Sequence, residues 1–113
     1  EDVNACIDLF EDGMVDSIIT VSEANRNPYF NMTVNHNGFA KLAISPTSKI
    51  TRRQDAPKVF DMTTVAYVID TNFVKNYDGI FEGKVKSIII PRERAVDIDG
   101  LIDFKIAELF LKN

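Results

Sequence analysis

The sequence predicts an incomplete α/β sandwich that carries a β-hairpin insert. Amphipathic helical patterns alternate with short β-branched runs, which is the order typical of an α/β layer. Between residues 23 and 58 this order gives way to short alternating stretches with many Asn and Pro residues. The chain has 113 residues, of which 45% are hydrophobic and 27% charged, so it can form one ordinary domain with a core of its own.

Composition excludes several classes of protein. A net charge of -4 argues against a general nucleic-acid binder, which needs a positive field. The one cysteine, Cys6, excludes a disulfide within the chain and suits a reducing compartment. No apolar run approaches the ~20 residues that cross a bilayer, and no signal peptide is present. We therefore expect no membrane association and a cytoplasmic location. Because the sequence starts at Glu1 without an initiating Met, we interpret it as a piece of a longer polypeptide.

The first two elements follow from their residue patterns. Val3, Cys6, Ile7 and Phe10 recur at helical spacing and predict a helix over 3–12 that Gly13 ends. The next run, 17–21, is β-branched and apolar on both faces, which predicts a strand covered on both sides within a parallel sheet.

The region from 23 to 58 predicts a hairpin. Phe30, Met32 and Val34 alternate with polar residues, and Asn37-Gly38 suits a tight turn before a returning strand over 39–44. An isolated two-stranded hairpin is marginal in water. Its apolar faces therefore need a further surface, either the α/β layer or a second copy of the protein.

The second half predicts four more elements, each marked by its own residues. The third strand ends at a proline, and the last helix carries an apolar stripe. The elements are a second buried strand over 65–69, a short helix capped by Asp70 or Thr71 and running through Lys75, a third strand over 84–90, and a helix over 101–112.

Two charged segments could carry chemistry. Lys49, Arg52, Arg53 and Lys58 form a basic cluster against a single acidic residue, Asp55. The cluster could pair with acidic residues of its own chain, or its arginine forks could bind a carboxylate or a phosphate. The five glycines form no phosphate-binding loop.

The second segment is Asp97-Ile98-Asp99, between the third strand and the last helix. An extended i, i+2 spacing points both carboxylates to one side, and Mg²⁺ commonly uses one or two protein carboxylates with water and substrate phosphates. The alternative is structural, with Asp99 as the helix N-cap and Asp103 as a first-turn carboxylate. The residues alone leave both readings open.

Four motifs resemble the C-terminal half of the CMP-N-acetylneuraminic acid synthetase (acylneuraminate cytidylyltransferase) family. They are Pro57-Lys58-Val59-Phe60, Ala66-Tyr67-Val68, the run PRERAVDID over 91–99, and DFKIAE over 103–108. The resemblance implies a partial Rossmann-like nucleotidyltransferase sandwich. It also implies a reaction in which CTP and a nine-carbon 2-keto sugar acid, such as sialic acid, condense with release of pyrophosphate.

The same resemblance implies roles for particular residues. Asp97 and Asp99 would be the catalytic Mg²⁺ ligands. Arg53 would bind the acidic sugar, Tyr67 would line its pocket, and Phe81 would reach across a homodimer into the partner's pocket. The hairpin region, 26–60, would be the dimerisation insert. The family's N-terminal CTP-binding loop is absent from these residues, so we expect the chain alone to be inactive.

Three departures from the family pattern leave the sugar open. Asp61 and then Thr63-Thr64 stand where sialic-acid members often carry a second arginine followed by Asn-Gly, Phe30 stands where some members have a lysine, and Ile80 replaces the first of two aromatic residues. A carboxylate near an acidic substrate costs affinity unless the substrate or its orientation differs. The alternatives are therefore a nucleotidyltransferase for another sugar, or a non-catalytic homodimerisation module.

Overall fold

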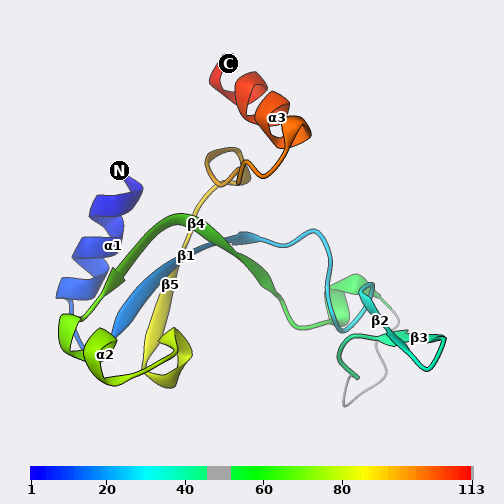
Figure 1. The fold of residues 1–113 in the computed structure, drawn as a ribbon, viewed down its shortest axis with the longest axis horizontal. Helices are drawn as coiled ribbons and strands as arrows, with labels where there is room; N and C mark the ends of the chain where they lie inside the picture. Colours follow the sequence, from blue (N-terminus) through cyan, green and yellow to red (C-terminus); the bar gives the residue numbers. More distant parts are fainter. Residues whose placement is uncertain (46–51, 113) are drawn as a thin grey trace. The chain divides into compact units, whose positions relative to one another are not determined.

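A computed structural model describes residues 1–45 and 52–112 of the chain (Figure 1). It divides into two compact units, the first made of Glu1–Glu23 with Asp61–Asn113 and the second of Ala24–Phe60. The order of helix, strand, hairpin, strand, short helix, strand and helix is the order expected from the sequence. The fold is a small mixed α/β structure, which confirms the predicted class.

The first unit contains a three-stranded sheet with the strand order β4-β1-β5. The central strand β1 (Ser17–Glu23) runs parallel to β5 (Val85–Ile89), with Ser17 opposite Val85. The arrows of β4 (Phe60–Ile69) and β1 point in opposite directions in Figure 1. The backbone N–H of Asp70, just beyond β4, accordingly donates to the carbonyl of Asp16, just before β1, at 2.9 Å. The sheet is therefore mixed: the expected parallel pairing is confirmed for β1 with β5 and is wrong for β4.

The core of this unit lies around β1, as its apolar sequence predicts. Ile18, Ile19 and Val21 are buried in β1. Cys6, from the helix α1 (Asp2–Glu11) that packs against β1, is fully buried as well. Gly13 follows α1 with φ of +93°, the left-handed conformation that glycine adopts easily, so the predicted helix end is confirmed.

The second predicted buried strand is longer and more exposed than its sequence suggests. β4 runs over Phe60–Ile69, and within it only Thr63 is buried. The reason is its position, because β4 is an edge strand of the sheet and β1 alone has neighbours on both sides. The predicted strand over 65–69 is therefore present, but the prediction that it is buried is wrong.

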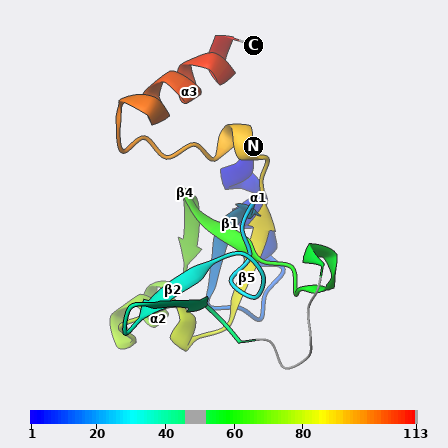
Figure 2. The same cartoon turned by 90° about the vertical axis from the view of Figure 1, so that its right-hand side faces the viewer.

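The second unit contains the predicted hairpin, formed by β2 (Thr33–His36) and β3 (Phe39–Leu42), cyan to teal in Figure 2. Asn37 and Gly38 make the turn with φ of +53° and +84°. Strand β2 starts later than expected, because the side chain and carbonyl of Asn27 hold the following residues in a turn: Asn27 Oδ1 accepts the N–H of Tyr29 at 2.9 Å. The predicted insert, 26–60, lies within this unit.

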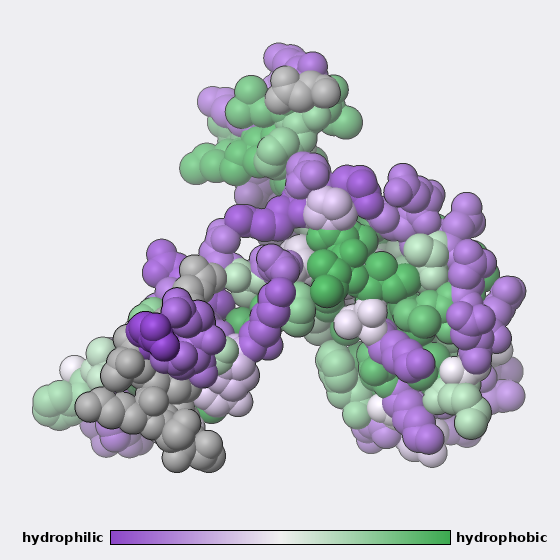
Figure 3. All heavy atoms as spheres, turned by 180° about the vertical axis from the view of Figure 1, so that it is seen from behind, coloured by the Kyte–Doolittle hydropathy of each residue, from purple (hydrophilic) through white to green (hydrophobic). Residues whose placement is uncertain are grey.

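The remaining elements are short, apart from the last helix. Asp70 caps α2 (Thr71–Asn76) by accepting the N–H of Asn72 at 2.7 Å, as predicted. The final helix is α3 (Leu101–Lys112), and its large apolar side chains are exposed in the structure (Figure 3). The other elements are the 3₁₀ turns η1 (Arg53–Asp55), η2 (Ile80–Glu82) and η3 (Arg92–Arg94). Among the described residues, no helix has both the length and the apolar character needed to cross a membrane.

Candidate functional site

The candidate site is a cavity of about 620 Å³ in the first unit. It lies near the end of β1, at Ser22, and where the chain leaves β5 toward η3. Open α/β sheets bind ligands beyond the carboxyl ends of their parallel strands, so the position is one at which a ligand is expected. The polar residues that line the cavity are Ser22, Asp61, Thr63, Arg92, Glu93, Asp97 and Asp103.

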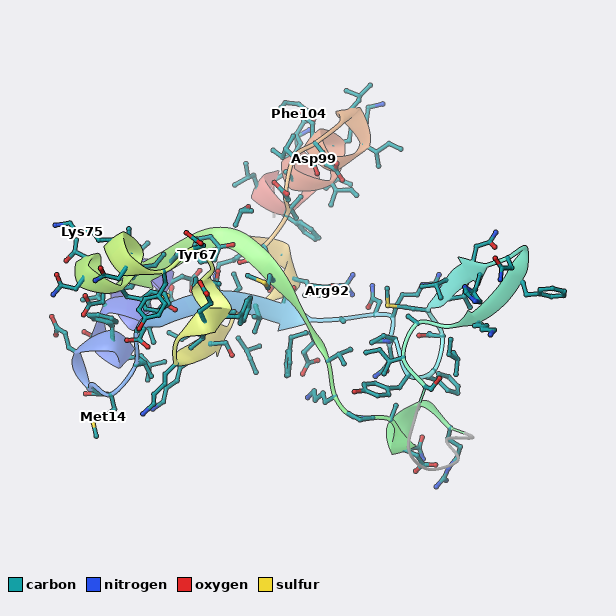
Figure 4. All side chains as sticks on the ribbon, turned by 60° about the horizontal axis from the view of Figure 1, so that its bottom comes forward. Met14, Tyr67, Lys75, Arg92, Asp99 and Phe104 are labelled. Atoms are coloured by element: carbon teal, nitrogen blue, oxygen red, sulfur yellow. The ribbon has the colours of Figure 1, made fainter. Side chains whose placement is uncertain are left out.

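Asp97 lies on the loop between η3 and α3 and lines this cavity, whereas Asp99 follows it on the same loop and is not among the lining residues. Both side chains are exposed. Figure 4 shows Asp99 beside Phe104 at the start of α3, with Arg92 on the turn that precedes the loop. Within residues 1–45 and 52–112, neither carboxylate accepts a hydrogen bond or forms an ion pair. Both are therefore available to a ligand.

The structural alternative for these acids is confirmed for Asp103, which lies in the first turn of α3, but not for Asp99 as the N-cap. One oxygen of Asp103 accepts the backbone N–H of Asp99 at 3.2 Å and that of Gly100 at 3.1 Å. The first helical bond runs from the N–H of Phe104 to the carbonyl of Gly100. Gly100 thus stands at the N-cap, and the carboxylate of Asp103 binds the N–H groups of Gly100 and of Asp99 before it. The start of α3 is capped without the carboxylate of Asp99.

The donor chemistry of the loop fits a hard divalent cation. Two exposed carboxylates without other partners match the one or two protein ligands that Mg²⁺ commonly takes, with water and phosphate oxygens completing the octahedron. The described part of the chain holds no group of three or more His, Cys, Asp or Glu residues that could bind a metal by themselves. A metal held by Asp97 and Asp99 would need further oxygen ligands, such as water, to complete its shell.

A buried pair of hydroxyls lies behind the wall of the cavity. Thr20 of β1 is fully buried, and its hydroxyl hydrogen-bonds to the hydroxyl of Thr63 on β4. The Thr20 hydroxyl also donates to the carbonyl of Ala66 at 3.2 Å. These bonds hold the first half of β4 against the central strand. Since Asp61 and Thr63 line the cavity from β4, the pair fixes that wall.

Tyr67 and Phe81, two other residues implicated by the family resemblance, are not among the lining residues. The hydroxyl of Tyr67 donates to the carbonyl of Thr63 at 2.7 Å, which is a hydrogen bond within β4. Phe81 lies in η2 and is 65% exposed, and in the described residues no aromatic ring stacks on it. The backbone of Arg53 begins η1, but its side chain lies outside the described residues. The roles of Arg53, Tyr67 and Phe81 stay predictions.

Two residues of the basic cluster, Arg52 and Lys58, contact other side chains of the same chain. The guanidinium of Arg52 pairs with Asp55 at 3.2 Å, and the ammonium of Lys58 lies 5.8 Å from the centre of the Phe60 ring. Lys49 lies outside the described residues. These contacts favour the reading in which the cluster pairs within the chain, at least for Arg52.

Sequence reasoning missed several lining residues. Ser22, Arg92 and Glu93 line the cavity, yet none was singled out for a role. Each lies at or just beyond the carboxyl end of a parallel strand. Knowledge that the runs over 17–21 and 84–90 pair in parallel is the signal that could have found them.

Comparison with known proteins gives two related sequences, whereas no protein-family model matches the chain. "Post-translational flagellin modification protein B" of Campylobacter coli is 32% identical over 111 residues, which are 98% of this chain and 46% of the relative. "CMP-N,N'-diacetyllegionaminic acid synthase" of Campylobacter jejuni is 34% identical over 94 residues, which are 83% of this chain and 39% of the relative. The chain therefore spans less than half the length of these curated relatives.

The similarities confirm the resemblance predicted from the sequence. In class, the chain is a mixed α/β protein that is similar to a CMP-N,N'-diacetyllegionaminic acid synthase. More particularly, it is a relative of the CMP-N-acetylneuraminic acid synthetase-like proteins, matched over nearly all of its own length.

Proposed function

We propose that this chain is the metal-binding and dimerising half, the C-terminal one, of a cytidylyltransferase. The complete enzyme transfers CMP from CTP to a 2-keto-3-deoxy sugar acid, either sialic acid or a related nonulosonate, and releases pyrophosphate. The support is the kinship with a CMP-N,N'-diacetyllegionaminic acid synthase, together with the acidic loop at the carboxyl edge of the sheet.

The observation that carries the proposal is that the carboxylates of Asp97 and Asp99 have no hydrogen-bond or ion-pair partner among the described residues. Asp97 faces a cavity of about 620 Å³, and neither it nor Asp99 is occupied by a partner among the described residues. Asp103 caps α3 in their place. A loop that only began a helix would have no need of these two further acids.

In the reaction, the anomeric hydroxyl of the sugar acid attacks the α-phosphorus of CTP and pyrophosphate leaves. Asp97 and Asp99 would hold Mg²⁺, which when bound offsets the negative charge of the triphosphate. Arg92 adds a guanidinium to the same cavity, and its planar fork suits phosphate oxygens. The task of these side chains is to position the triphosphate and offset its charge.

We further propose substrate roles for the remaining residues named by the resemblance. Arg53 would bind the carboxylate of the sugar acid and Tyr67 would contact the sugar. Phe81 would enter the partner's pocket in a homodimer, a role that its exposed position allows. The segment 26–60, within the second compact unit, would form the dimer contact.

The test is pyrophosphate release by the full-length protein from CTP and either N-acetylneuraminic acid or N,N'-diacetyllegionaminic acid, with and without Mg²⁺. Asp99→Asn should lower the rate by at least about 100-fold while the circular dichroism spectrum stays native. Asp8→Asn, an exposed acid on α1, is the matched control and should keep its rate. If Asp99→Asn retains full activity, or if the wild type releases no pyrophosphate and only dimerises, the proposal is wrong.

A further inference from the structure

A bidentate ion pair joins two residues of the first unit that lie far apart in the sequence, Arg94 and Asp2. Arg94, the last residue of η3, donates from Nε to Oδ2 of Asp2 at 3.1 Å and from Nη2 to Oδ1 of the same carboxylate at 3.0 Å. The Asp2 side chain is only 17% exposed, whereas Glu1 is 86% exposed and lies 4.0 Å from the same guanidinium. Two parallel bonds fix the orientation of the arginine as well as its distance.

Asp2 is itself well anchored. It is the first residue of α1, which packs against the central strand and buries Cys6 completely. On the other side of the pair, Ile90 is 2% exposed and its N–H donates to the carbonyl of Val21 at 2.8 Å. The segment between Ile90 and Arg94 is thus tied to the sheet at its first end and to α1 at its last.

The acidic loop begins directly after this segment. Only two residues separate Arg94 from Asp97. Downstream, Asp103 holds the N–H groups of Asp99 and Gly100. In the part of the chain that the structure describes, no side chain hydrogen-bonds to residues 95–98. The position of this loop therefore depends on two anchors, the Arg94–Asp2 pair before it and Asp103 after it.

We infer that Arg94 and Asp2 are positioning residues that hold the acidic loop in the geometry required for binding the metal ion. The inference rests on the function proposed above. Without the pair, the loop samples more conformations before the metal binds, and ordering it then costs conformational entropy. This entropy cost weakens metal binding, whereas the carboxylates that contact the metal are unchanged. Metal affinity should therefore fall while the rate at saturating metal stays near that of the wild type.

The experiment measures metal binding and catalysis separately in the full-length protein. Free Mn²⁺ is followed by electron paramagnetic resonance in the presence of CTP, and the Mg²⁺ dependence of pyrophosphate release is recorded in parallel. Asp2→Asn and Arg94→Ala should each weaken both apparent affinities by roughly three- to fivefold, which is the scale of an exposed ion pair with good geometry. The kcat at saturating Mg²⁺ should stay within about twofold of the wild type.

Matched variants separate positioning from a general effect of charge. Glu1→Gln removes the same charge one residue earlier without breaking the bidentate pair, and should leave Mn²⁺ affinity unchanged. Arg94→Lys keeps the charge but loses the fork, and should give an intermediate affinity. The double variant, Asp2→Asn with Arg94→Ala, should bind Mn²⁺ no more weakly than either single variant, because both remove one interaction.

Unchanged Mn²⁺ affinity in folded Asp2→Asn and Arg94→Ala proteins would overturn the inference, as would additive losses in the double variant. The proposed function fails in a different way, through the absence of Mg²⁺-dependent pyrophosphate release from the wild type. Loss of folding in Arg94→Ala leaves the test to Asp2→Asn and Arg94→Lys, which preserve side-chain size more closely.

Discussion

The hydroxyl of Thr20 in the central strand hydrogen-bonds to the hydroxyl of Thr63 in the neighbouring edge strand, and both residues are buried. The pair explains how β4 stays against β1 although most of β4 is exposed. It also places the polar wall of the candidate cavity, because Thr63 lines that cavity.

Replacing Thr20 with valine should lower the free energy of unfolding by about 1–3 kcal/mol, because the buried hydroxyl of Thr63 loses its bond to Thr20 and keeps only the N–H of Val65. The measurement is urea unfolding followed by circular dichroism. Thr64→Val, on the exposed face of the same strand, is the control and should change stability by less than about 0.5 kcal/mol. Equal losses in the two variants would mean that the buried hydroxyl pair contributes nothing specific.

Gly83 should not tolerate a side chain. A Cβ atom at this position would lie 2.5 Å from Oδ2 of Asp16 and 2.5 Å from the ring of Phe73, which is buried. Gly83→Ala should therefore cost about 1–3 kcal/mol of stability, whereas Gly79→Ala, whose Cβ would meet its nearest neighbour at 3.7 Å, should cost less. Thermal unfolding of both variants tests this, and a Gly83→Ala protein as stable as the wild type would contradict the packing described.

Cys6 should react slowly with thiol reagents in the folded protein. Burial, and to a smaller extent the charge of Asp2, raise the pKa of the Cys6 thiol above its usual 9.0. The measurement is the rate of modification by a disulfide reagent at pH 8, which should rise sharply when urea unfolds the protein. Rapid modification without unfolding would show that the thiol is accessible.

The same shift sets a pH dependence of stability. The folded state favours the neutral thiol of Cys6. The contribution of this thiol to stability is therefore complete below its unfolded pKa of 9.0, and it is lost as the pH rises through its higher pKa in the folded protein. Stability should therefore decline above pH 9, and Cys6→Ala should reduce that decline. An identical alkaline decline in the two proteins would assign it to other groups.

The sequence predicted most elements of the fold because their local signals agreed with their environment. The β-branched run of β1, the left-handed Gly13 and the Asn37-Gly38 turn are all found where expected. The burial of β4 was not predictable from its residues. Its apolar side chains are as numerous as those of a central strand, and only the pairing order shows that it lies at an edge.

The candidate site was predictable in part. The i, i+2 spacing of Asp97 and Asp99 marked the loop, and the structure shows that their carboxylates are not used within the described residues. Neither the cap formed by Asp103 nor the pairing of Arg94 with Asp2 follows from local sequence. The pairing joins residues 92 positions apart, which only the tertiary fold brings together.

The central claim is that Asp97 and Asp99 bind the catalytic metal ion together with CTP. The most direct measurement is an anomalous difference map from crystals of the full-length protein grown with CTP and Mn²⁺. We expect a single strong peak within coordination distance, about 2.0–2.3 Å, of carboxylate oxygens of both residues and of phosphate oxygens. A peak on the phosphates that neither aspartate contacts would contradict the claim.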